Sequence, residues 1–504
     1  MRSIFRIYMK DYDKDSYGHI LKYTSLFGGV QGLNILIGLV RTKIVTWLLG
    51  PGGMGLASLF QTTANFISQA TNLGISFSAV RNVSELFDTG DETRIAHFIK
   101  VVRAWSLLTG LIGTLLCMLA GSILSQLTFN WGDHTLHFVV LAPLVGILAV
   151  TGGETAILKG ARQLRSLAVI QMYNVIAALL ISVPVYYFFG ESGIVPVMLL
   201  TGLISMLLTI RHSHKLYPLR LTGGRGILGE GMGMVKLGVA FTLAGIFGSG
   251  ADFVIRTYLN KVSSLDEVGL YNVGFVITMT YAGMIFSAME SDYFPRLSAV
   301  NNDRAKCRDL ISKQAEVSLL LISPIVVAAI FLLPIALPLL TSEKFLPVVD
   351  MMRLMSLALY LRAVNLSLEY LSLAKGASLS YLFLEGVYDL LIVILTIVGY
   401  IYFGLTGTGI ALLVAGLFNT LLVMGYIGLR FGVFVRKTIF LLLLIQLAIG
   451  ATAFFATQWL SGWGYWLSGI LLFIVSLSIS VNILRRKTHL WDKIKAKIHK
   501  KLEK

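Results

Sequence analysis

Charged residues are scarce in this chain of 504 residues, of which only 13% are Asp, Glu, Lys or Arg. A soluble domain carries about 25% charged residues, because its surface must be wetted. Hydrophobic residues reach 56%, and the mean hydropathy is +0.78. The polar area is therefore too small to cover a soluble globule of this size, and we expect lipid to surround most of the protein.

Signals for redox, metal and nucleotide chemistry are also few. The two cysteines, Cys117 in an apolar segment and Cys307 in a connection, are expected at different depths, so no disulfide framework is predicted. The GxGxxG match at 50–55 follows an apolar segment rather than a strand, which argues against a dinucleotide site. The Asp-His-Thr-Leu-His stretch at 133–137 offers too few metal ligands. We therefore expect no cofactor, no metal and no enzymatic activity.

Long apolar segments recur along the whole chain. Each reaches roughly the 20 residues that a helix needs to cross the hydrocarbon core, and in lipid the backbone must satisfy its own hydrogen bonds, which favours helices. We predict an all-α integral membrane protein of about fourteen spans. The expected spans are 24–49, 56–80, 104–127, 136–158, 167–189, 192–210, 237–259, 269–295, 316–340, 346–374, 379–403, 407–429, 438–458 and 464–484.

Basic residues are unevenly divided between the two sides of these spans. Of the 42 Lys and Arg, the connections on one side hold only Lys43, Lys261 and Lys344. The positive-inside rule then places both termini in the cytoplasm. The net charge of +16 is thus mostly a topology signal and does not indicate nucleic acid. In the tail, 485–504, apolar residues four apart among lysines fit either an interfacial helix on anionic lipid or simple retention of the last span.

A weak repeat divides the chain into halves. An Arg-Thr pair at 41–42 is followed by Gly-Leu at 55–56, and the same pairs return at 256–257 and 269–270. Six spans per half make the halves parallel repeats about an axis along the membrane normal. The expected parts are a cytoplasmic N-terminal segment (1–23), an N-lobe (24–210), a cytoplasmic connection (211–236), a C-lobe (237–430), a further pair of spans (431–484) and the basic tail (485–504).

Polar residues inside the spans fall on helical stripes, at intervals of three, four and seven residues. Such side chains are costly in lipid, so we expect the stripes to surround a common hydrated cavity. The amides expected to line it are Gln31, Asn34, Gln61, Asn65, Asn72 and Asn365. Arg41, Arg256 and Arg362 would make this cavity net cationic. Because arginine binds phosphate through a planar fork of donors, anionic cargo such as a diphosphate is favoured.

Several stretches, in order and spacing, resemble the polysaccharide flippases of the multidrug/oligosaccharidyl-lipid/polysaccharide (MOP) exporter superfamily, and look most like translocases of O-antigen and common-antigen lipid-linked oligosaccharides (Wzx type). The resemblance implies a V-shaped bundle with spans one to six facing seven to twelve. The stretches are LLGPGGMGLASLFQ from Leu48, DEVGLYNVGF from Asp266, FSAMESDYFPRLS from Phe286, SEKF from Ser342 and YLSLAKGASLSYLFLEGVYDLL from Tyr370.

The same resemblance implies an activity. It implies that an undecaprenyl-diphosphate-linked oligosaccharide is flipped across the bacterial cytoplasmic membrane by alternating access, with membrane lipids and glycan polymerase or other assembly proteins as partners. Cavity arginines would hold the diphosphate, and an ion gradient or membrane potential would drive the cycle. The implied diphosphate residues are Arg41 and Arg256, with Arg81 at the entrance and Arg362 in the cavity, and the titratable candidates are Asp252, Glu369 and Glu154.

Two other transport functions stay open. A cation or drug antiporter of the same superfamily would have a site dominated by carboxylates and aromatic rings. A flippase for a peptidoglycan lipid precursor would differ only in the glycan. A membrane-bound glycan polymerase or ligase would need a large outer loop, whereas the outer connections here are only a few residues long.

Overall fold

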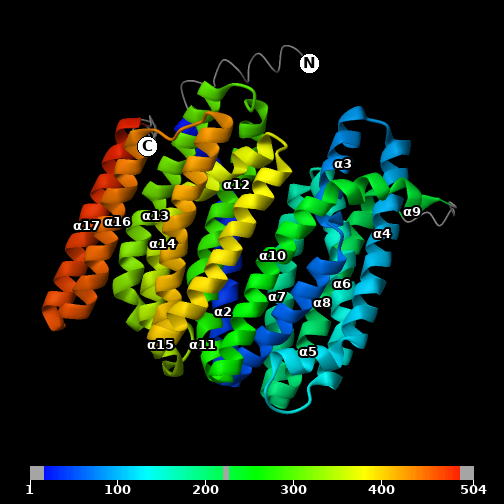
Figure 1. The fold of residues 1–504 in the computed structure, drawn as a ribbon, viewed down its shortest axis with the longest axis horizontal. Helices are drawn as coiled ribbons and strands as arrows, with labels where there is room; N and C mark the ends of the chain where they lie inside the picture. The colour runs from blue at the N-terminus through cyan, green and yellow to red at the C-terminus, as the bar shows by residue number, and fades with distance from the viewer. Residues whose placement is uncertain (1–15, 219–225, 488–504) are drawn as a thin grey trace, which may run out of the picture.

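The computed structural model describes residues 16–218 and 226–487, and every regular element within them is helical (Figure 1). The predicted all-α membrane fold is confirmed. The N-terminal segment up to residue 15, part of the inter-lobe connection and most of the basic tail lie outside the described residues, so the interfacial tail helix stays a prediction.

The N-lobe is built from the first half of the chain. Its first helix, α2 (Ser16–Thr71), holds two expected spans, because Gly50 adopts a φ of 64° and breaks the helix between them. Only glycine takes this backbone conformation without strain. The other elements of the lobe are α3 (Ile75–Thr89), α4 (Glu92–Leu119), α5 (Gly121–Thr128), α6 (Thr135–Gly160), α7 (Leu164–Phe189), η1 (Gly190–Gly193) and α8 (Ile194–Leu216).

The C-lobe is built from the second half of the chain. Its long helix α15 (Ser378–Phe431) also holds two spans, which Gly404 separates with a φ of 57°. Its elements are α9 (Ile227–Glu230), α10 (Met232–Val262), α11 (Leu265–Phe275), the π-helical turn η2 (Val276–Thr280), α12 (Tyr281–Ala299), α13 (Arg304–Leu340), η3 (Glu343–Val348), α14 (Val349–Ala374) and α15. Two more helices follow, α16 (Lys437–Trp459) and α17 (Gly462–Lys487).

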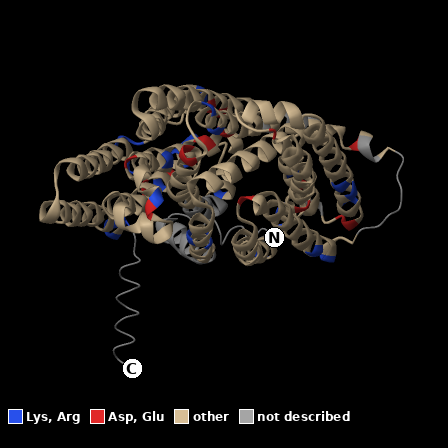
Figure 2. Cartoon of the chain, turned by 90° about the horizontal axis from the view of Figure 1, so that it is seen from below, with Lys and Arg blue, Asp and Glu red and all other residues tan. Residues whose placement is uncertain are grey.

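Eight helical stretches of the described chain are long and apolar enough to cross a membrane. Two of them, Arg165–Leu216 and Ser378–Phe431, contain two expected spans each, and Gly32–Thr71 covers most of two more. The expected spans in α10, in α11 to α12 and in α14 are not among the eight stretches, although each is helical. The helices agree with about fourteen spans. Figure 2 shows charged positions as isolated patches on an otherwise uncharged ribbon.

Both ends of the described chain lie on one side of the bundle, called here the terminal face (Figure 1). On the opposite face the two lobes touch backbone to backbone. A Cβ added at Gly269 of α11 would lie 1.8 Å from the Pro51 carbonyl oxygen of α2, and one at Gly55 would lie 2.1 Å from the Leu265 oxygen. The two glycines are the repeated Gly-Leu positions, so equivalent elements of the two halves meet where only glycine fits.

The last two helices pack on the outer side of the C-lobe, next to α13 (Figure 1). Arg353 of α14 donates to the Tyr465 hydroxyl of α17 at 3.1 Å. At the other end of α17, Lys487 reaches the Glu316 carboxylate of α13 at 2.5 Å. Polar contacts therefore fix this pair to the C-lobe at both ends.

Candidate functional site

A polar cavity of about 460 Å³ lies between the lobes, in the half of the molecule nearer the terminal face. We call it the inter-lobe chamber. Its polar lining comes from α2 and α3 on one side and from α10 on the other. The polar lining residues are Asn65, Ser68, Gln69, Asn72, Ser76, Ser249 and Asp252.

The amide stripe on α2 forms one wall of this chamber. Asn65 and Asn72 lie on the lining, and Gln61 donates to the Asn65 amide oxygen at 3.0 Å. Asn72 donates to the Ser76 hydroxyl of α3 at 2.7 Å. These side chains offer donors and acceptors without net charge, which suits a hydroxyl-rich ligand.

A second cavity, of about 370 Å³, lies inside the C-lobe between α10, α11, α14 and α15. Its lining holds four carboxylates, Asp252, Glu369, Glu385 and Asp389, together with the guanidinium of Arg362. We call it the carboxylate cavity. Asn365, on the predicted α14 stripe, also lines it. The expectation of a net cationic cavity is therefore wrong for this site, which carries more acidic than basic groups.

Asp252 belongs to both cavities. Its carboxylate accepts from Arg256, one helical turn along α10, at 2.7 Å. The Asp252 side chain is 46% exposed, whereas that of Arg256 is 5% exposed. The carboxylate thus remains open to solvent and ligands while its partner is enclosed.

Arg256 does not face either cavity freely. Its second terminal nitrogen donates to the Asn272 side chain at 3.3 Å, and its guanidinium lies 5.6 Å from the Tyr271 ring centre and 5.7 Å from that of Phe275. The residue is enclosed by an ion pair and two aromatic faces. Its present geometry serves to hold Asp252 rather than to bind cargo.

Arg41 lies on α2 beside the boundary between the lobes. Its Nε donates to Ser182 of α7 at 3.1 Å, and the next residue, Thr42, shares a hydrogen bond of 3.1 Å with Tyr281 of α12. Arg41 is half-buried, and the structure shows no ion pair for it among the described residues. Nine residues separate it from Gly50, which places it roughly 14 Å from that end of the span.

The structure thus separates the three arginines that were expected to share one cavity. Arg41 lies between α2 and α7, Arg256 is buried within the C-lobe, and Arg362 lines the carboxylate cavity. Residue spacing identifies helix faces, but it does not show which faces of different helices meet.

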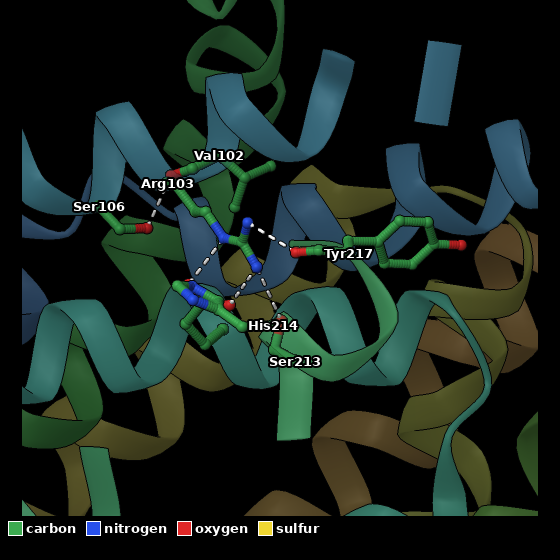
Figure 3. Close-up of polar contacts among 7 residues, drawn as sticks. Val102, Arg103, Ser106, Ser213, His214 and Tyr217 are labelled. Carbon is green, nitrogen blue, oxygen red and sulfur yellow. Dashed lines mark hydrogen bonds and ion pairs between the residues drawn. The ribbon is translucent and has the colours of Figure 1, made fainter. Parts of the chain in front are cut away.

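Glu154 is not in either cavity. It lies in α6 and is 4% exposed, where Arg103 of α4 binds it at 2.8 and 3.3 Å (Figure 3). The same guanidinium donates to the Tyr217 carbonyl and to the Ser213 hydroxyl at the end of α8, and His214 lies 3.3 Å from the carboxylate. This cluster ties three helices together and places Glu154 apart from the carboxylates of the second cavity.

The other predicted residues are dispersed. Arg81 of α3 is exposed near the terminal face and pairs with Glu85 at 2.8 Å. Asn34 is 4% exposed, and its side-chain oxygen has no hydrogen-bond partner among the described residues. Gln31 belongs to α2, but its side chain is not among those that the structure describes.

Two acidic residues of the carboxylate cavity were missed in the sequence. Glu385 and Asp389 are four residues apart in an apolar span, and this spacing puts them on one helix face. That pattern could have identified them. Asp389 keeps one buried carboxylate oxygen without a partner in the described structure. Within the described residues no three His, Cys, Asp or Glu side chains converge as a metal site.

The fold is shared with known membrane transporters. An inward-closed structure of the lipid II flippase MurJ is similar to 91% of this chain and 99% of its own length, with a TM-score of 0.68 and 15% identity. An inward-facing multidrug-resistance MATE transporter of the MOP superfamily matches 78% of this chain and 94% of its own, with a TM-score of 0.65 and 16% identity. A MOP transporter from Pyrococcus furiosus Vc1, described as having a binding pocket of reverse polarity, matches 82% of this chain and 96% of its own, with a TM-score of 0.59 and 14% identity.

The sequence comparisons give the family. No curated protein sequence matches the chain. The family described as "Polysaccharide biosynthesis protein" matches residues 44–350, which is more than half of the chain and includes α10 with its charged pair. With two lobes of the MOP fold around a polar chamber, this chain belongs to the polysaccharide biosynthesis protein family.

Proposed function

We propose that this protein is a flippase that moves an undecaprenyl-diphosphate-linked oligosaccharide, such as an O-antigen unit, across the bacterial cytoplasmic membrane by alternating access. The observation that carries the proposal is the inter-lobe chamber. Amide and hydroxyl side chains from both lobes line it, so a glycan could exchange water for protein hydrogen bonds as it crosses. The family match with polysaccharide biosynthesis proteins supports a saccharide cargo.

The conformation of the chain fits one stage of such a cycle. The lobes touch through glycine backbones at the face opposite the termini, and again on the terminal-face side of the chamber, where a Cβ added at Gly74 would lie 2.3 Å from the Gly238 carbonyl oxygen of α10. The chamber therefore lies between two contacts of the lobes, which fits a closed stage of alternating access. The lipid tail would stay in the bilayer, because only the headgroup needs a polar path.

Arg41 is the proposed contact for the diphosphate. Ser182 holds its Nε, which leaves the terminal nitrogens of the fork to bind phosphate oxygens. Arg256 would contribute only after Asp252 releases it, Arg81 is the proposed entrance residue, and Arg362 contacts the cargo from the C-lobe side.

The carboxylate cavity is the proposed site of ion coupling. Asp252 and Glu369 lie on its lining with Glu385 and Asp389, and Asn419 donates to Glu369 at 3.0 Å. A cation that binds or leaves this acidic group changes how strongly Asp252 holds Arg256. Because Asp252 also lines the inter-lobe chamber, binding of the cation would thereby change the charge that the chamber presents to its ligand.

The diphosphate proposal is tested by replacing Arg41 and Arg256 with Ala, singly and together, and Arg41 also with Lys. Surface glycan is measured in cells that depend on this protein, at matched protein levels. We expect Arg41→Ala to lower assembly by roughly tenfold to a hundredfold, as for loss of a charge-assisted contact worth about 1.5–3 kcal/mol. Exposed Arg94 of α4 provides the control, and Arg94→Ala should leave assembly unchanged. Undiminished assembly in the double Ala variant would remove the proposal.

A second candidate is supported by one specific observation. The carboxylate cavity combines four acidic side chains with the rings of Tyr271, Phe275 and Tyr388, which is the pattern expected for a cation or drug antiporter. Efflux of cationic dyes by cells that make this protein would favour that function. Unchanged dye accumulation together with restored surface glycan favours the flippase.

The cargo glycan is the remaining alternative. MurJ, a lipid II flippase, shares the fold at 15% identity, and charge arguments do not separate its cargo from other diphosphate-linked saccharides. Rescue of cells depleted of their peptidoglycan-precursor flippase would identify a peptidoglycan cargo. Failure of that rescue, with O-antigen assembly restored, would identify an oligosaccharide of the O-antigen type.

A further inference from the structure

A groove of about 790 Å³ runs between α7 and α8 on the N-lobe, separate from both cavities described above. Its apolar walls are formed by Val169, Tyr173, Ile176, Ala177 and Leu180 of α7 and by Ile204 and Leu208 of α8. At the terminal-face end, the last turns of α8 add Arg211, His212 and Lys215. No acidic residue lies on this lining.

The groove faces away from the cargo path. Its positions on α7 recur every three or four residues and form one helix face, with Val169, Tyr173 and Leu180 along it. Ser182, which holds Arg41, lies about 160° around the same helix. A ligand in this groove is therefore not positioned to reach Arg41 or the inter-lobe chamber.

The length of the groove matches one leaflet of a bilayer. From Val169 to Leu180 the helix rises by roughly 16 Å, and from Ile204 to Lys215 by the same amount. Half of the hydrocarbon core is about 15 Å thick. The groove thus runs from the terminal face to about the middle of the membrane, which is the depth of one acyl chain.

The charged end of the groove fits a phosphate. Arg211 and Lys215 are one helical turn apart, both are exposed, and neither has a hydrogen bond or ion pair among the described residues. A guanidinium fork and an ammonium group next to each other are suited to phosphate oxygens. Basic pockets between membrane helices on the cytoplasmic side recur as sites for anionic lipid headgroups.

We infer that the α7–α8 groove is a binding site for an anionic phospholipid of the cytoplasmic leaflet, with its phosphate on Arg211 and Lys215 and one acyl chain along the apolar walls. The occupant is a structural lipid rather than the transported cargo. It fills the space between two helices that otherwise meet through few polar contacts, such as Asn174 to Ser205 at 3.0 Å. This site does not depend on which saccharide the protein carries.

The test uses native mass spectrometry of the purified full-length chain in mild detergent, with phosphatidylglycerol, phosphatidylethanolamine or phosphatidylcholine added. Wild type should retain one phosphatidylglycerol in preference to the other two lipids. The double variant Arg211→Ala/Lys215→Ala should bind it roughly thirtyfold more weakly, the ratio expected for two lost basic contacts at a membrane surface. Arg165→Ala, which removes an exposed basic residue of α7 that is not on the lining, should bind it normally.

A second pair of variants tests the apolar walls. Ala177→Phe should fill the groove and reduce phosphatidylglycerol retention without changing any charge, whereas Leu207→Phe, at an exposed position of α8 beside the groove, should not. Thermal unfolding without added lipid confirms that each variant is folded. Equal retention of the three lipids, or unchanged binding in the double Ala variant, overturns the proposal. Displacement of phosphatidylglycerol by equimolar undecaprenyl diphosphate also overturns it, because the groove would then hold cargo lipid.

Discussion

Charged residues in this protein differ in how deeply they are enclosed. Arg103 and Glu154 are 8% and 5% exposed as side chains and pair through both carboxylate oxygens, whereas Arg81 and Glu85 are 57% and 61% exposed. A buried charge that loses its partner keeps the full penalty of leaving water. An exposed pair is largely screened and contributes little.

We therefore expect Arg103→Ala to lower the free energy of unfolding by about 3–5 kcal/mol. The lost contacts leave Glu154 buried without its cation and free the end of α8. Thermal or denaturant unfolding in detergent measures the change. Arg81→Ala is the control, with a loss of about 0–1 kcal/mol, and equal losses in the two variants would contradict the structural role of the cluster.

His134 gives the end of the N-lobe opposite the terminal face a dependence on pH. The centre of the imidazole ring lies 4.1 Å from that of the Phe129 ring and 4.7 Å from that of the Trp131 ring. Burial lowers the pKa of His134 below its usual 6.5. Below pH 6.5 the unfolded chain binds a proton that the folded ring resists. Stability is thus lost as the pH falls from 6.5 toward the folded pKa.

The variant His134→Phe should remove part of this acid sensitivity. The melting temperature of wild type should fall more between pH 7.5 and pH 5 than that of the variant, because the variant lacks the imidazole whose protonation favours unfolding. Scans of both proteins in the same detergent make the comparison. Identical acid shifts would show that His134 does not titrate on unfolding.

Residue patterns in the sequence predicted which side chains share a helix face better than which residues of other helices they contact. Asn65 and Asn72, which the sequence places on one stripe, both line the inter-lobe chamber, because helical spacing alone defines a face. The partner of Glu154 is 51 residues away, and Asp252 meets Asp389 only through the packing of α10 on α15. Such contacts depend on tertiary structure, which spacing does not encode.

At the scale of elements, the sequence predicted the helices well because lipid imposes their length. The expected spans are helical for most of their length, although 56–80 is interrupted between α2 and α3 and 104–127 between α4 and α5. The two unexpectedly long helices, α2 and α15, bend at Gly50 and Gly404 between expected spans. Loop and span boundaries are set by hydropathy and glycine, and both are visible in a single sequence. The contact between α2 and α11 was not predicted, although the repeat marked both of its glycines.

That contact leads to a prediction for Gly269. Gly269→Ala places a Cβ into the Pro51 carbonyl, where backbone rather than a flexible side chain must move. We expect the variant to favour separation of the lobes at this face and to lose most of its transport, measured as surface glycan. Gly425→Ala in α15, where nothing lies within 4 Å of the added Cβ, is the matched control and should transport normally.

Accessibility labelling completes this test. A cysteine introduced at Ala57 of α2 should react faster with a membrane-impermeant thiol reagent in the Gly269→Ala background than in the parent. Equal labelling with full transport would show that the glycine contact does not close this face.

At the scale of the whole molecule, α16 and α17 are expected to move with the C-lobe, since Arg353 and Glu316 hold α17 at its two ends and α16 packs against α13, α14 and α17. Spin labels at Lys306 of α13 and Arg486 of α17 should keep one distance distribution throughout the cycle. Labels at Arg94 of α4 and Lys306 report on the two lobes at the terminal face, and their distance should shorten when cargo or the coupling ion is added. Changes in the first pair comparable to those in the second would contradict a rigid C-lobe unit.

Asp252 lines both the inter-lobe chamber and the carboxylate cavity. Under the proposed function, a saccharide in the inter-lobe chamber should alter the affinity of the carboxylate cavity for a cation, and thermodynamic reciprocity then requires the cation to alter saccharide affinity by the same factor. Titrations of either ligand in the presence of the other should therefore give one common coupling constant. Replacing Asp252 with Asn should bring that constant toward unity and leave two independent binders in one chain.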